Sequence, residues 1–143
     1  MIPRTLLVAS GAFGRLSAQR VSAAISEGLA GSGLSSDQCP LEGVGDLPTE
    51  VRALLEAVDF DARMRRARAV VLAQWRLQER TLAGSAAFEI ATRARQAGVP
   101  AYAVTGENTL DAFDARILDL QVILEAPTAR ALAAAGRRLA ELV

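Results

Sequence analysis

The chain has 143 residues, of which 51% are hydrophobic and 22% are charged, and its 16 basic side chains balance its 16 acidic ones. This length fits a single domain, residues 1–143, and the zero net charge argues against nucleic acid as a partner, because a phosphate-binding surface needs a basic excess. The sequence contains neither His nor Lys, which excludes the commonest general base and zinc ligand, a Lys Schiff base and a P-loop.

The N-terminal region reads as a strand and not as a targeting segment. Its apolar run, Leu6–Ala9, is too short for the core of a signal peptide and far too short to span a bilayer. Cys39 is the single cysteine, so the sequence offers no disulfide framework and suits reducing conditions. We therefore expect a cytoplasmic protein that does not contact a membrane.

Apolar runs alternate with helical periodicities along the chain, which predicts β-α-β units. The predicted elements are a strand at Leu6–Ala9, a helix from Ser17 to the glycines at 28–33, an edge strand at Gln38–Leu41, helices at Pro48–Val58 and Asp61–Arg68, a strand at Ala69–Ala73, a helix at Ser85–Ala97, strands at Pro100–Val104 and Leu120–Leu124, and a last helix after Pro127. Right-handed β-α-β units place helices on both faces of a parallel sheet. The fold class expected is α/β, a Rossmann-like three-layer α/β/α domain with a mostly parallel sheet.

Some polar features allow both a structural and a functional interpretation. Gly11–Gly14 follows the first strand as a phosphate loop would, but it lacks the G-x-G-x-x-G pattern, which favours a tight turn. Asp111 and Asp114, three residues apart, fit a solvated helix face better than a metal site, and the basic run Arg63–Arg68 fits such a face better than a nucleic-acid patch. We expect no catalytic residue, no metal site and no cofactor.

The ends of the predicted strands carry polar side chains that could hold a ligand, because open α/β sheets bind ligands beyond the carboxyl ends of their strands. The turn expected after Ala69–Ala73 contains amides and an indole, without an acid until Glu79. Thr105–Asn108 reads as a flexible turn that could bind an anion through backbone N–H groups. The candidate ligand-binding residues are Ser10, Arg15, Gln74, Arg76, Thr105 and Asn108, with an organic acid or phosphate as the ligand.

Two segments resemble the bacterial glycerate kinase family. Leu6–Ala18, L-L-V-A-S-G-A-F-G-R-L-S-A, is similar to the family pattern V-I-A-P-D-S-F-K-G-S-L-S-A. Ala67–Ala86, A-R-A-V-V-L-A-Q-W-R-L-Q-E-R-T-L-A-G-S-A, is similar to A-D-L-V-I-T-G-E-G-R-L-D-x-Q-T-L-x-G-K-A. The resemblance covers most of this chain but only one of the two lobes of the family's proteins. The second lobe, which the kinases insert after the segment matching Pro40–Asp46, has no counterpart here.

The departures from these patterns fall on charged positions. The family's Asp and Lys of the first turn fall on Ser10 and Phe13, and in the second turn its Glu, the Gly after it, its Asp and its Lys fall on Gln74, Trp75, Gln78 and Ser85. Phosphoryl transfer depends on cations and on carboxylates that hold Mg²⁺, which an amide cannot replace. The resemblance therefore implies a catalytically inactive glycerate-kinase-like domain that acts as a binding or interaction module. A small-molecule binding protein, and a glycerate kinase subunit that uses ATP together with a separate second lobe, stay open as alternatives.

Apolar residues near the strand ends also predict assembly. In the two-lobed kinases this surface faces the second lobe, which implies that Phe13, Trp75 and Leu77 share an exposed patch here. Such patches mark interaction sites, and Trp often anchors interfaces. We therefore expect a homodimer or another protein partner, although Trp75 folded over the strand ends would leave a self-sufficient monomer.

Overall fold

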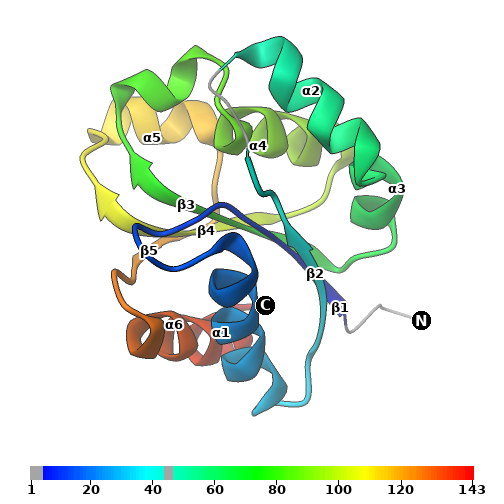
Figure 1. Cartoon of the computed structure of the whole chain (residues 1–143), viewed down its shortest axis with the longest axis vertical. Helices are drawn as coiled ribbons and strands as arrows, with labels where there is room; N and C mark the ends of the chain where they lie inside the picture. The colour runs from blue at the N-terminus through cyan, green and yellow to red at the C-terminus, as the bar shows by residue number, and fades with distance from the viewer. Residues whose placement is uncertain (1–4, 44–46) are drawn as a thin grey trace.

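A parallel sheet forms the centre of the molecule (Figure 1). The computed structural model describes residues 5–43 and 47–143, whose strands form a five-stranded sheet in the order β2-β1-β3-β4-β5 with every neighbouring pair parallel. The elements are β1 (Thr5–Ser10), α1 (Ala18–Ala30), β2 (Ser35–Pro40), α2 (Pro48–Ala57), α3 (Phe60–Arg65), β3 (Ala69–Leu77), the 3-10 helix η1 (Glu79–Ala83), α4 (Ala86–Ala97), β4 (Ala101–Asn108), α5 (Ala112–Leu118), β5 (Ile123–Glu125) and α6 (Ala129–Leu142). The predicted α/β fold class is confirmed.

Helices cover both faces of the sheet, α1 and α6 on one face and α2, α3, α4 and α5 on the other (Figure 1). Alternate strand residues supply the two cores, so that Leu6 and Val8 pack toward α1 and α6 while Leu7 and Ala9 pack toward the other layer. Both faces of the central strands are thus buried, which explains their continuous apolar runs. In the described part of the chain, no helix combines the length and apolar character needed to cross a membrane.

Two central strands are longer than the sequence predicted. The segments expected as turns, Gln74–Leu77 and Thr105–Asn108, are the last residues of β3 and β4, and they pair with each other in the register that matches Gln74 with Thr105. The turn predictions at these segments were therefore wrong. Each segment is polar because the paired ends extend toward the sheet's carboxyl edge, where solvent replaces part of the helical cover, as the exposure of Arg76 and Glu107 shows.

Smaller corrections concern element ends. The second strand lies at the sheet edge as predicted but begins at Ser35, and the last strand is shorter than Leu120–Leu124. The short helix predicted at Asp61–Arg68 begins at Phe60 and ends at Arg65. The predicted helix start at Ser17 is confirmed, because Ser17 caps α1 with a side chain that accepts the N–H of Arg20 at 3.2 Å.

One member of the basic run, Arg63, is a structural residue. Its guanidinium forms two hydrogen bonds to the carboxylate of Asp37 on β2, at 2.7 and 3.0 Å, and also donates to the carbonyls of Val58 and Gln38. The arrangement ties α3 to the exposed sheet edge. Beneath it, burial raises the pKa of the Cys39 thiol, and the nearby Arg63 partly opposes that rise.

The helices α1 and α6 touch through their backbones. A Cβ at Gly28 would overlap Ala133 and Arg137, and a Cβ at Gly136 would overlap the carbonyl of Ile25. Glycine is therefore required at both positions by close approach, although both are helical residues with ordinary backbone angles. This contact brings α6 against the helix that follows the first strand.

We predict that Gly28→Ala and Gly136→Ala each destabilise the fold, because the helices must separate to admit a methyl group. The expected loss is about 1–3 kcal/mol in the free energy of unfolding, measured by urea unfolding with circular dichroism. Gly31→Ala is the matched control, since Gly31 has a φ of −60° and no neighbouring atom within 3.6 Å of the added Cβ. Equal stability of Gly136→Ala and Gly31→Ala would contradict the prediction.

Candidate functional site

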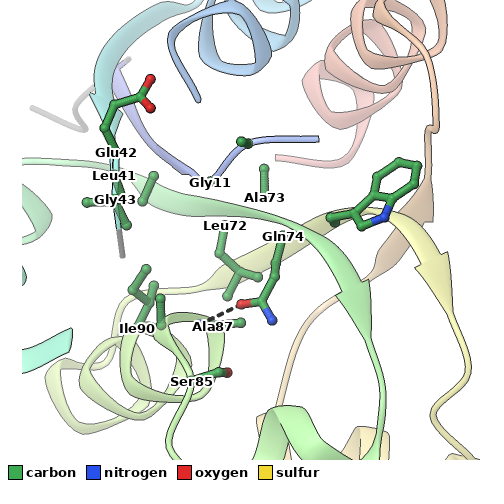
Figure 2. Close-up of a pocket in the computed structure, with 14 residues that line it drawn as sticks. Gly11, Leu41, Glu42, Gly43, Leu72, Ala73, Gln74, Ser85, Ala87 and Ile90 are labelled. Atoms are coloured by element: carbon green, nitrogen blue, oxygen red, sulfur yellow. Dashed lines mark hydrogen bonds between the residues drawn. The ribbon is translucent and has the colours of Figure 1, made fainter. Parts of the chain in front are cut away.

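A cavity of about 310 Å³ opens at the carboxyl ends of β1 and β3 (Figure 2). After β1 the chain passes to α1 on one face, whereas after β3 it passes to α4 on the other. This divergence of neighbouring strands is the position at which open α/β sheets bind ligands. The connection between β2 and α2 contributes Leu41, Glu42 and Gly43 to the wall.

The cavity wall is mainly apolar. Its floor comes from β1, β3 and α4, including Ala9, Leu72, Ala87 and Ile90. Gln74 and Ser85 bring side-chain hydrogen-bonding groups to the wall, and Glu42 is the single charged residue among the lining residues that the structure describes. Few polar groups in an apolar cavity are typical of small-molecule sites.

The protein's own side chains occupy the amino end of α4. The Gln74 Oε1 accepts the backbone N–H of Ala87 at 3.1 Å, the bond drawn in Figure 2. Ser85 accepts the N–H of Phe88 at 3.3 Å and donates its hydroxyl hydrogen to the carbonyl of Thr81. Free N–H groups at a helix start attract anions, so these two side chains remove donors that a phosphate would otherwise use.

Trp75 packs on the α1 and α6 side of the sheet. Its indole lies against the backbone of Gly106 on β4, where a Cβ would overlap the ring, and its ring centre lies 5.6 Å from that of Phe13 in an edge-to-face arrangement. Trp75 also borders the cavity. Its indole therefore covers the carboxyl end of β4 on the α1 and α6 side of the sheet.

The structure does not bring the candidate ligand-binding residues together. Of these six, only Gln74 lines the cavity. Ser10 is fully buried, where its hydroxyl bonds to the carbonyl of Ala18 and to the Ser22 hydroxyl. Thr105 is also fully buried, and its hydroxyl lies 3.2 Å from the Trp75 carbonyl and 3.1 Å from that of Glu107. Both hydroxyl groups therefore form hydrogen bonds within the protein and do not face the cavity.

The remaining candidates lie outside the cavity. Arg15 is exposed in the tight turn closed by Phe13 and Leu16, which confirms the turn interpretation of the first loop. Arg76 pairs with Glu107 at 3.5 Å, and both side chains are more than half exposed. The Asn108 side chain accepts the N–H of Leu110 and so stabilises the turn after β4.

The expected apolar patch is also absent, as judged from the described residues. Phe13 and Leu77 are 2% and 0% exposed, and they belong to cores on opposite faces of the sheet. The prediction that Phe13, Trp75 and Leu77 share one exposed surface was therefore wrong. Homodimer formation stays a prediction, without the patch on which it was based.

Sequence reasoning missed most of the cavity wall. Leu72, Ala87 and Ile90 were assigned to ordinary strand or helix cores, and nothing in their residue types distinguishes a cavity wall from a core. Leu41 and Glu42 reach the site only because β2 pairs beside β1. That pairing is a property of the whole sheet and leaves no local signal.

The described residues offer no preformed metal cluster. They contain no group of three or more His, Cys, Asp and Glu side chains that could hold a metal ion. Asp111, a member of the acidic pair, instead caps α5, where it accepts the N–H of Asp114 at 2.7 Å. The described cavity wall also lacks a cation that could meet a transferred phosphoryl group.

The parallel sheet and the cavity at its strand divergence define an open α/β domain with a cavity at its strand ends. The model of the glycerate kinase family matches residues 30–142, and the chain belongs to the glycerate kinase family. The matched range includes the second resembling segment, Ala67–Ala86, and leaves the first, Leu6–Ala18, outside. No curated protein matches the chain.

We predict that Gln74→Ala and Ser85→Ala each lower the free energy of unfolding by about 1 kcal/mol, because each removes an acceptor from the start of α4. Urea unfolding provides the measurement. Gln96→Ala is the control, since Gln96 is exposed near the other end of the same helix, and it should change stability by less than about 0.5 kcal/mol. A Gln74→Ala protein as stable as Gln96→Ala would show that the bond to Ala87 contributes nothing.

Proposed function

We propose that this member of the glycerate kinase family does not transfer phosphoryl groups and acts as a binding module through the strand-end cavity. The observation that carries the proposal is the hydrogen bond from the Ala87 N–H to the Gln74 side chain. Gln74 replaces the Glu of the resembled family motif with a neutral amide, and that amide is committed to the helix start. An amide there cannot hold Mg²⁺ as a carboxylate does.

The charge distribution around the cavity supports the same proposal. Kinases surround the transferring phosphoryl group with cations and metal-bound carboxylates, because charge on its oxygens must be stabilised. The positions that match the charged Asp and Lys residues of the resembled family motifs carry Ser10, Phe13 and Ser85 here. Of these, Ser10 and Phe13 are buried in the protein core. A binding function needs the cavity but none of these charges.

An organic acid or phosphate receives less support as the ligand than the sequence suggested. Arg15 and Arg76, the cations among the candidate residues, are not part of the described cavity wall. The described cavity wall carries no cation, and an anion buried without a partner costs several kcal/mol. We therefore place the binding function in the cavity without assigning it an anion.

We predict that the isolated chain shows no ATP-dependent phosphorylation of glycerate. A coupled assay with Mg²⁺-ATP and glycerate should stay at background, with an active glycerate kinase in the same assay as the positive control. Mg²⁺-ATP should also leave the melting temperature unchanged, because a ligand stabilises a protein only if it binds the folded state. Turnover in the usual kinase range, about 1–100 s⁻¹, would overturn the proposed function.

A further inference from the structure

We infer that the strand-end cavity takes a small uncharged molecule, mainly apolar and with one oxygen that accepts a hydrogen bond. This inference rests on the proposed binding function and adds the chemical class of the ligand. It departs from the phosphorylated and carboxylated compounds that a kinase site would hold.

The size and lining of the cavity set the first limit. Its volume of about 310 Å³ is at the lower end of the range for small-molecule sites. Leu41, Leu72, Ile90 and Ala87 line the cavity, but each is at most 4% exposed, so only a small part of each side chain is open to a ligand. A compact apolar ligand removes this surface from water, which favours binding.

Gln74 sets the polar requirement. Its Oε1 accepts from Ala87, and its Nε2 donates one hydrogen to the carbonyl of Arg76 at 3.2 Å. A primary amide carries two such hydrogens, and within the described residues no acceptor is recorded for the second. The amide is half-buried in the cavity wall and open to solvent, so an oxygen on the ligand would replace solvent as the acceptor of its second hydrogen.

The charges around the cavity favour a neutral ligand over an ion. Glu42 is exposed at the rim, and in Figure 2 its carboxylate points away from Gln74 and Ile90. A ligand carboxylate would either be buried without a cation or lie at the rim near Glu42. A ligand ammonium group inside the cavity would gain no ion pair from Glu42, whose carboxylate is turned away.

The test compares three ligands with one ring and different polar ends: cyclohexylmethanol, cyclohexanecarboxylate and cyclohexylmethylamine. Calorimetric titration into the full chain should show that the alcohol binds at least about tenfold more tightly than the carboxylate. The alcohol should also bind no more weakly than the amine. These probes stand for the chemical class and not for the natural ligand.

Two variants test whether the alcohol binds in the cavity. Ala86 is half-buried at the cavity wall, so Ala86→Leu should fill the opening and remove binding of the alcohol. Ala115→Leu is the control, because Ala115 is also a half-buried helical residue but lies outside the cavity. The control should bind the alcohol as the original chain does, with circular dichroism confirming that both variants fold.

Several results would overturn the inference. The first two are no binding of the alcohol and a carboxylate that binds as tightly as the alcohol or more tightly. The third is unchanged binding of the alcohol to the Ala86→Leu variant. The fourth is an amine that binds more tightly than the alcohol and loses this advantage in the Glu42→Gln variant. Each of these leaves the proposed lack of phosphoryl transfer standing. Conversely, phosphorylation of glycerate by the isolated chain would overturn the proposed function whichever cyclohexyl ligand binds.

Discussion

The parallel pairing of β1 with β3 is the constraint on which the rest of the molecule depends. These neighbours end at the same edge, but the chain leaves them for opposite faces of the sheet, toward α1 and toward α4. Neither helix can cover the gap between the two strand ends. The cavity is therefore a product of strand order, and its wall is built from whichever residues the strands carry to that edge.

At this edge, side chains of the protein itself satisfy the N–H groups at the start of α4. A helix start has unpaired N–H groups and partial positive charge, which an anionic ligand or a capping side chain can satisfy. Here the amide of Gln74 and the hydroxyl of Ser85 provide the caps. The stability of α4 is thereby independent of a bound anion, whereas a helix start left open for phosphate would gain from one.

The sequence predicted the fold class and the central strands because their residues are buried on both faces. Leu6–Ala9 and Ala69–Ala73 are continuous apolar runs, which a strand between two helical layers requires. The extensions Gln74–Leu77 and Thr105–Asn108 escaped prediction because each is stabilised by pairing with the other, distant in sequence. Two polar segments carry no local sign of that mutual pairing.

The sequence indicated where a cavity could lie but not which residues would line it. A cavity does lie at the strand ends, and Gln74, one of the residues chosen, lines it. Ser10 and Thr105 were chosen for their hydroxyl groups, but these groups are consumed by internal hydrogen bonds that depend on how α1 and β3 lie against them. Residue type indicates what a side chain can bond to, whereas the tertiary structure decides whether that capacity is already used.

The backbone contact between Gly28 and Gly136 also has a consequence for the order of events during synthesis. β1 and α1 leave the ribosome early, but the groove of α1 that receives α6 stays empty until residues 129–142 have been made. Until then Val104 and its neighbours on that face of the sheet lack the cover that Leu132 and Leu139 provide. Closing such a long loop is entropically costly. Folding of this face is therefore completed only after α6 has emerged, however early the strands form.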